Sequence, residues 1–425
     1  MSNARSVLGQ ASVRRLLVAN ALAGVAISLL LTVLFKQAFD ITDDELTIGI
    51  IGLLQFVPAL LLVVVSGYLA DRFDRRRLTA VATAGRVVCA IGMVAYSRSV
   101  GDVSDGSDAA IWPLFLLTLL FGTVDAVGIP ARHAITPLVV ERNELPNLVA
   151  IAASTRVAAS IVGPVAGGFL YVVGADVAYL VAAILFAVSI PFLLAVRYAS
   201  EPERLTQRPS LALAVEGLGF IRRTPVVASA IGLDMFAVLF GGAIALLPAI
   251  AEDRLGVGDV AYGWLRAAPG IGSAAMGIVL ATRPIERRVG PMLLVAIAVF
   301  GVGHVALGLT TSYAVAFCAI LLAAGADMVS MTIRSTLVPV ATPDDQLGRV
   351  TAVESVFIGA SNELGAFESG VAARWLGVPW AVAGGGVATI AIVGLFAVFA
   401  PALRRVDTYA DVDARRRAAE PAPTA

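Results

Sequence analysis

Long apolar runs alternate along the chain with short segments that hold most of its charged residues. A helix needs roughly 20 apolar residues to cross the ~30 Å hydrocarbon core of a bilayer. This pattern predicts an all-α membrane protein with twelve transmembrane helices, near residues 14–37, 47–70, 78–98, 111–137, 147–172, 176–197, 225–250, 260–281, 289–310, 313–339, 349–374 and 379–402. The first run is longer than the apolar core of a cleaved signal sequence, about 7–15 residues, and is interpreted as the first of these helices.

Composition agrees with this pattern and excludes several classes of function. Of the 425 residues, 58% are hydrophobic and 15% are charged, and the mean hydropathy is +0.87. A soluble domain has about 45–50% apolar and about 25% charged residues. The formal net charge is zero, so nothing indicates a nucleic-acid partner. The sequence holds neither a phosphate-binding loop nor a catalytic cluster of His, Ser or Cys, and we expect no cofactor, no metal and no enzymatic activity.

The placement of basic residues predicts the orientation in the membrane. If both termini are inside, the inner segments hold twenty-four basic residues and the outer segments hold four. Such an excess marks the cytoplasmic side. We therefore expect a multi-pass protein of a bacterial inner (cytoplasmic) membrane, surrounded by lipid, with both termini cytoplasmic. Thirty of the basic residues are arginines and one is Lys36, a bias typical of a GC-rich bacterial genome.

The two halves of the sequence resemble each other at a constant offset of 202 residues. This shift maps Asp125 onto Asp327, Arg132 onto Arg334 and Pro137 onto Pro339 without a gap. Two related six-helix halves are typical of secondary transporters, in which the substrate site lies near the bilayer midplane. The predicted domains are an N-terminal half (1–197), a cytoplasmic linker with an amphipathic helix (198–224), a C-terminal half (225–402) and a disordered cytoplasmic tail (403–425).

A charged motif lies between the second and third predicted helices, in the stretch SGYLADRFDRRR (66–77). It resembles the signature Gly-x-x-x-Asp-Arg/Lys-x-Gly-Arg/Lys-Arg/Lys of the major facilitator superfamily, through Gly67, Asp71, Arg72, Arg75 and Arg76. Asp74 stands where the second glycine is usual. An aspartate there followed by Arg-Arg-Arg-Leu is similar to the branch that contains enterobactin-type siderophore exporters and macrolide-efflux relatives. The segments GIPARHAITPLVVERNELPN (128–147) and EGLGFIRR resemble the same branch.

This resemblance implies a cytoplasmic gate that latches the two halves together. Asp71 is expected at the inner end of its helix, where helix N-termini or Arg132 would face its negative charge. Arg132 and its repeat counterpart Arg334 are assigned to the same gate. The alternative is that the arginines of the loop only enforce topology.

A second motif lies in the fifth predicted helix, in ASIVGPVAGG (159–168). It resembles the antiporter motif Gly-x-x-x-Gly-Pro-x-x-Gly-Gly through Gly163, Pro164, Gly167 and Gly168, with Ala159 at the first position. In the family this motif marks exporters that exchange substrate for protons. Small residues at this spacing allow helices to approach closely, and proline permits a bend. Ordinary helix packing is the alternative interpretation.

Several carboxylates fall inside predicted membrane helices, where an ionised side chain costs roughly 2.5–3.5 kcal/mol. Arg156 is the expected charge partner of Asp125, whereas the position equivalent to Arg156 in the second half is Ile358. Asp327 therefore lacks that cation, and an unpaired buried carboxylate favours the protonated form that proton coupling requires. The proton-coupling candidates are Asp327 first, then Asp234, Asp125 and Glu354. A structural alternative fixes Asp327 by Arg334 or Arg266.

These features predict a secondary active transporter that exports amphipathic small molecules, such as drugs, a siderophore or another metabolite, in exchange for protons. The expected central cavity, with a few carboxylates, suits cationic or amphipathic molecules. Candidates for its lining are Asn20, Gln55 and Arg266. A proton-coupled importer or a lipid flippase of the same fold is the alternative. The expected partners are substrate, protons and lipid, with the monomer as the functional form.

Overall fold

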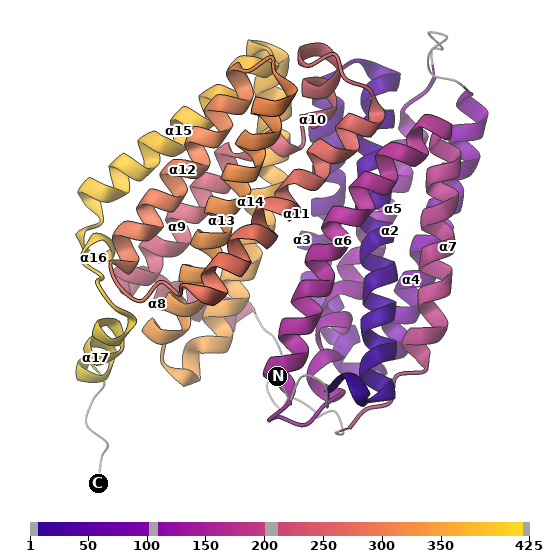
Figure 1. Cartoon of the computed structure of the whole chain (residues 1–425). Coiled ribbons are helices and arrows are strands. Elements are labelled where there is room, and N and C mark those ends of the chain that lie inside the picture. Colours follow the sequence, from indigo (N-terminus) through magenta and orange to yellow (C-terminus); the bar gives the residue numbers. More distant parts are fainter. Residues whose placement is uncertain (1–6, 102–108, 200–210, 420–425) are drawn as a thin grey trace. The chain divides into compact units, whose positions relative to one another are not determined.

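The computed structural model describes residues 7–101, 109–199 and 211–419; within these ranges, the side chains of residues 63, 64, 70, 71, 211–215 and 419 are not described. Every regular element in the described ranges is a helix (Figure 1). The twelve long helices are α2 (Ala11–Thr42), α3 (Glu45–Arg72), α4 (Arg75–Val100), α5 (Trp112–His133), α6 (Leu145–Val173), α7 (Ala175–Leu194), α9 (Pro225–Phe240), α11 (Asp259–Thr282), α12 (Val289–Leu309), α13 (Tyr313–Ala341), α14 (Asp344–Leu376) and α15 (Val378–Phe399).

The prediction of a twelve-helix, all-α membrane protein is confirmed. Eleven of these helices are long and apolar enough to cross a membrane. The twelfth, α14, has 33 residues but is too polar to meet that criterion. Its charged residues are Asp344, Asp345, Arg349, Glu354, Glu363, Glu368 and Arg374.

The seventh predicted helix ends ten residues earlier than its apolar run. After Phe240 the chain continues as a 3-10 turn, η3 (Gly242–Ile244), a single turn, α10 (Leu247–Ala249), and a π-helical turn, η4 (Ile250–Arg254). The reason is a close backbone contact with α14: a Cβ atom on Gly242 would lie 2.1 Å from the carbonyl oxygen of Gly365. Only a glycine fits at that distance, and apolarity alone does not reveal such a break.

The chain divides into two compact units. Unit 1 comprises Met1–Pro209 and Leu247–Gly270, and unit 2 comprises Ser210–Leu246 and Ile271–Ala425. In unit 1, α2 packs along α6 and α7, α3 packs along α5, and α4 packs along α5 and α7. In unit 2, α12 packs along α13 and α15, and α14 packs against α8 (Leu211–Arg223), α9 and α15. Leu247–Gly270 therefore belongs to unit 1 although it lies in the second half of the sequence.

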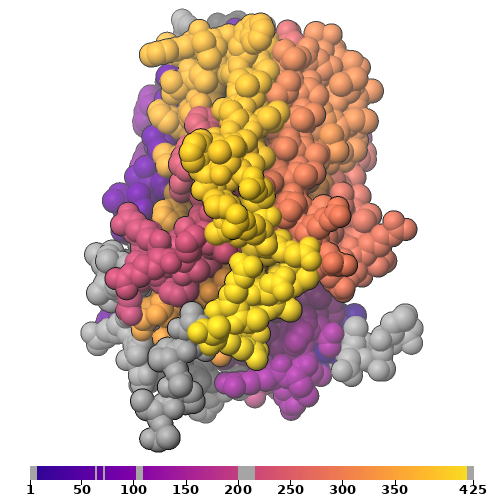
Figure 2. Space-filling view, turned by 90° about the vertical axis from the view of Figure 1, so that its left-hand side faces the viewer, coloured from indigo at the N-terminus to yellow at the C-terminus, as the bar shows by residue number. Residues whose placement is uncertain are grey.

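The C-terminal tail differs from the expected disorder over part of its length. After the short helix α16 (Pro401–Arg404), residues Tyr409–Ala419 form helix α17. Figure 2 shows α15, α16 and α17 following one another in yellow along one face of unit 2. Val412 is buried in the core of that unit, and Asp413 pairs with Arg416 and Arg417 one turn further on. The prediction of disorder is thus wrong for residues 409–419, because apolar packing and (i, i+4) ion pairs stabilise the helix.

Candidate functional site

A charged cluster lies in unit 2, where three helices bring together residues far apart in sequence. The Arg334 guanidinium on α13 is 2.8 Å from a carboxylate oxygen of Asp234 on α9 and 3.7 Å from one of Glu354 on α14. Arg334 and Asp234 are 5% and 3% exposed. A buried ion pair persists only where its partners satisfy each other's charge. Arg334, assigned from sequence to the cytoplasmic gate, is therefore the counter-charge of two proton-coupling candidates.

Asp327 stands apart from these pairs. It lies two helical turns before Arg334 on α13, and it feels the charge of Arg334. Among the described residues, Asp327 forms no ion pair. Arg334, the cation on the same helix, pairs instead with Asp234 and Glu354 from other helices. The alternative in which Arg334 fixes Asp327 by an ion pair is therefore replaced by a weaker attraction between the two charges at longer range.

The equivalent carboxylate of unit 1, Asp125, has a different partner from the one expected. The Nε of Arg86 on α4 donates to Asp125 on α5 at 2.5 Å, and the Arg86 side chain is 1% exposed. The expected pairing of Asp125 with Arg156 is therefore corrected. Arg86 lies about three turns after the start of α4, among apolar residues. No motif in the sequence indicated that it would pair with Asp125.

A cavity of about 570 Å³ opens in unit 1 between α2, α6 and the end of α5. Arg132, His133 and Arg156 supply its basic side chains, and Asn20, Ser28, Thr136 and Ser160 add polar groups among apolar ones. Among the described residues, no carboxylate lines it. Asn20 lines this cavity, and its predicted place in a substrate cavity between the two halves stays a prediction. Gln55 does not line this cavity, and the Arg266 guanidinium lies 5.0 Å from the centre of the Phe35 ring.

The charged motif forms the junction of α3 and α4. Asp74 caps α4 by accepting hydrogen bonds from the backbone N–H groups of Arg76 and Arg77, at 2.9 and 3.1 Å. Burial opposes ionisation of this carboxyl, but the Arg76 side chain and these N–H groups together hold the pKa of Asp74 below its usual value. Asp74 has φ −58°, so this turn does not require glycine. The aspartate at the position where glycine is usual therefore serves as the N-cap of α4.

The neighbouring arginines of the motif bind the ends of other helices in unit 1. Arg75 donates to the carbonyl oxygen of Ala134 at 3.2 Å, and Arg76 donates to that of Val196 at 2.6 Å. Arg72 donates to the hydroxyl of Tyr68, one turn earlier on α3. Gly67 lies on α3 as well, and the side chain of Asp71 lies outside the described residues. The expected contact between Asp71 and Arg132 therefore stays a prediction.

The small residues of the second motif face two other segments of unit 1. A Cβ atom on Gly163 would lie 2.5 Å from Cβ of Ser28 on α2, and one on Gly168 would lie 2.5 Å from the carbonyl oxygen of Asp259 on α11. Ala159 and Gly167 also lie close to α2, and Pro164 is within α6 without interrupting it. The motif thus permits close helix contact on two sides of α6, as expected from the residue sizes.

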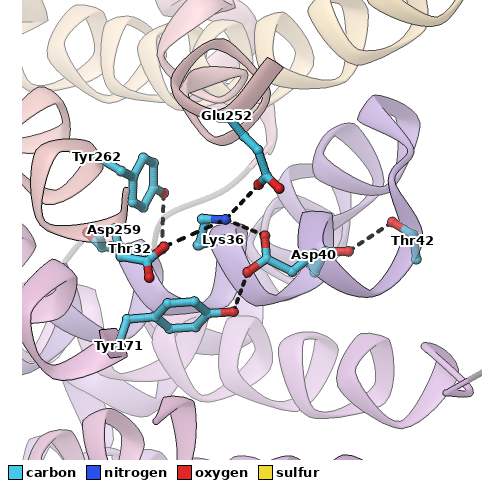
Figure 3. A network of polar contacts seen from close by, with 9 residues as sticks. Thr32, Lys36, Asp40, Thr42, Tyr171, Glu252, Asp259 and Tyr262 are labelled. Atoms are coloured by element: carbon cyan, nitrogen blue, oxygen red, sulfur yellow. Dashed lines mark hydrogen bonds and ion pairs between the residues drawn. The ribbon is translucent and has the colours of Figure 1, made fainter. Parts of the chain in front are cut away.

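A further polar network surrounds Lys36, which is 6% exposed on α2. Its ammonium group lies 2.5 Å from Asp40, 2.7 Å from Glu252 and 3.7 Å from Asp259 (Figure 3). Tyr171 on α6 donates its hydroxyl to Asp40 at 2.6 Å. The network joins α2 and α6 to η4 and α11. Sequence reasoning missed it, although a lysine four residues before an aspartate at the end of an apolar run was a usable signal.

Replacing Lys36 with methionine is expected to lower the free energy of unfolding by about 1–3 kcal/mol, because it leaves three carboxylates near one another without their cation. Thermal unfolding of the purified protein in detergent measures this. The matched control is Arg98→Met, since Arg98 pairs with Asp176 at 3.0 Å while 63% of its side chain is exposed. Such exposed pairs contribute at most about 1 kcal/mol. Equal unfolding temperatures for the two variants would contradict the prediction.

Twelve long helices, buried ion pairs within them and an apolar cavity with a few polar side chains define a polytopic membrane transporter of the secondary-carrier type. The sequence model described as Major Facilitator Superfamily matches residues 16–366. The chain belongs to the major facilitator superfamily.

Relatives of the chain agree with this membership. It is 24% identical over 374 residues to the uncharacterized MFS-type transporter YfiS of Bacillus subtilis, covering 82% of this chain and 83% of that protein. It is 26% identical over 338 residues to the enterobactin exporter EntS of Escherichia coli O127:H6, covering 78% and 76%.

Solved structures show the same fold. A D-xylose-proton symporter aligns with a TM-score of 0.69 at 13% identity, covering 91% of this chain and 97% of that one. A bacterial homologue of the human lysosomal transporter Spinster aligns with a TM-score of 0.64 at 16% identity, covering 97% and 98%.

Proposed function

We propose that this transporter exports amphipathic small molecules in exchange for protons. The observation that carries the proposal is the half-buried carboxylate Asp327, which has no ion-pair partner among the described residues and lies two turns from Arg334, the shared partner of Asp234 and Glu354. A proton carrier must accept and release its proton during each cycle, whereas an arginine partner favours the ionised form of a carboxylate. Asp234 and Glu354 hold Arg334 in place, and Asp125 is neutralised by Arg86.

Export is favoured over import by two further features. The glycines of α6 form the close contacts that the antiporter-like motif requires, and the relative EntS is named an enterobactin exporter. In the proposed cycle, the α3–α4 junction serves as the cytoplasmic gate, the two six-helix halves alternate access to the cavity, and both termini lie in the cytoplasm. Drugs, siderophores and other amphipathic metabolites are the proposed substrates.

Proton flux in inverted membrane vesicles tests this proposal. Vesicles that contain the protein are loaded with acid, and cationic dyes, macrolides and catechol siderophores are added outside while the internal pH is followed. Antiport makes the lumen more alkaline, because an entering substrate molecule drives protons out. Proton-coupled import makes the lumen more acidic, since substrate and proton enter together. Vesicles without the protein serve as the control, and no pH change with any compound contradicts proton-coupled export of these classes.

A further inference from the structure

We propose that the cavity of unit 1 binds the anionic group of its substrate, and that Arg132 and Arg156 make the charge-assisted contacts. The substrate class is an amphipathic organic anion, such as a carboxylate attached to an aromatic or aliphatic body. That this anion is exported rests on the proposed function. That it binds in the cavity does not, because binding is measured without any proton flux.

The cavity has the size and lining of a small-molecule site. Its volume of about 570 Å³ falls within the range of roughly 300–1,000 Å³ that is usual for such sites. Most of its wall is apolar, from residues such as Ile27, Leu145 and Val149. Polar groups reach it from α2, α5 and α6, so an enclosed molecule would meet them on several sides. A few convergent polar groups in an apolar wall fix the orientation of a ligand.

Among the described residues of unit 1, the basic side chains at this cavity have no ion-pair partner. Arg86 is neutralised by Asp125, but neither Arg132 nor Arg156 makes an ion pair with a described residue. Arg132 instead experiences repulsion from Arg86 and Arg156 that the attraction of Asp125 offsets in part. Arg132 is half-buried, Arg156 is exposed, and both line the cavity. Cationic side chains that face a cavity within a membrane protein mark a substrate pathway or pair with a ligand. Guanidinium groups match a carboxylate in geometry and charge.

A simpler explanation accounts for Arg132 alone. Arg132 lies in the last turn of α5, where a helix C-terminus attracts a positive charge. Arg156 lies near the middle of α6 (Leu145–Val173), where no such attraction operates, and it lines the same cavity. Arg156 therefore needs another cause, and an anionic ligand that also contacts Arg132 supplies one.

The sequence favoured a cationic or amphipathic substrate, and this inference narrows that expectation to an amphipathic anion. The membrane-helix carboxylates Asp234, Asp327 and Glu354, which favoured a cationic or amphipathic substrate, lie in unit 2. The repeat-related positions have opposite roles in the two units. In unit 1 the carboxylate Asp125 is paired and the arginine Arg132 lacks a partner among the described residues, whereas in unit 2 Arg334 is paired and Asp327 lacks one.

Fluorescence binding to the purified full-length protein in detergent tests the inference. Three probes share one fluorophore and differ in charge: dansylglycine (anionic), dansylglycinamide (neutral) and dansylcadaverine (cationic). We expect dansylglycine to bind about tenfold to a hundredfold more tightly than its amide, as a charge-assisted contact implies. Equal affinity for the two probes, preference for dansylcadaverine, or no binding of dansylglycine would overturn the inference.

Variants assign the binding to the cavity. Arg132→Gln and Arg156→Gln are each expected to weaken dansylglycine binding by about tenfold and to leave the amide unaffected. Arg132→Lys and Arg156→Lys keep the charge and should retain most of the preference, which separates recognition from misfolding. Arg142→Gln, at an exposed position outside the cavity, is the matched control. An unchanged preference in both glutamine variants would place the anion elsewhere and refute the assignment.

The outcome separates this inference from the proposed export. Selective dansylglycine binding without any substrate-driven proton flux refutes proton exchange and supports the anion site. Proton efflux driven only by cationic compounds, with no binding of dansylglycine, supports proton exchange and refutes the anion site.

Discussion

Replacing Arg334 with glutamine is expected to destabilise unit 2 by about 3–5 kcal/mol, the usual cost of leaving a buried charge without its partner. Asp234, 3% exposed, has its carboxylate 2.8 Å from Arg334. Glu354 loses the same cation. Thermal unfolding of the purified variant measures the effect, and we expect little folded protein at growth temperature.

Two comparisons identify the cause of this destabilisation. The double variant Arg334→Gln with Asp234→Asn removes both charges of the closest pair, and we expect it to recover part of the lost stability. Arg349→Gln is the matched single control, because Arg349 pairs with the half-exposed Glu216. Its expected cost is at most about 1 kcal/mol. If Arg334→Gln unfolds at the temperature of Arg349→Gln, the buried cluster does not stabilise the unit as described.

Replacing Asp327 with asparagine is expected to abolish substrate-driven proton flux while the protein stays folded. The amide has the shape of the carboxyl group but carries no titrating proton. No ion pair of Asp327 with a described residue is lost in this change, so the loss of stability should be well below that expected for Arg334→Gln. Proton flux is measured in the acid-loaded inverted vesicles, and substrate exchange without a pH gradient is measured alongside it. We expect the variant to retain that exchange, because substrate binding does not need the proton carrier.

The repeat supplies the matched control for this variant. Asp125→Asn makes the same chemical change at the equivalent position, but it leaves the buried Arg86 without its partner. We expect this variant to lose about 3–5 kcal/mol of stability. Normal proton flux in Asp327→Asn would contradict its role as carrier and would leave Asp234 and Glu354 as the candidates.

Much of the fold was predictable because a bilayer imposes a simple rule on the sequence. Backbone groups in lipid must form their hydrogen bonds within the segment, so each long apolar run becomes a helix. The predicted edges of α2, α6 and α12 lie within five residues of the observed ones. The helix α14 was predictable from its length and spacing although it is too polar for an apolarity criterion. The break after Phe240 was not predictable, since it depends on the approach of another helix at Gly242.

The sequence predicted which ionisable residues belong to the candidate site, but not which of them form ion pairs with one another. The ionisable residues of the membrane helices were evident from their cost in lipid. Their partners depend on how helices are rotated against one another, which a sequence period does not specify. Asp125 thus pairs with Arg86, and Arg334 joins Asp234 and Glu354.

The sequence by itself determined the class of this protein: the helix count, the family motifs and the residues that carry charge into the membrane. These features follow from local rules of length, polarity and residue size. Only the tertiary structure decided which charges neutralise each other, because an ion pair requires two side chains within about 4 Å. That decision leaves Arg132 and Arg156 facing the cavity of unit 1 and Asp327 without an ion pair among the described residues of unit 2.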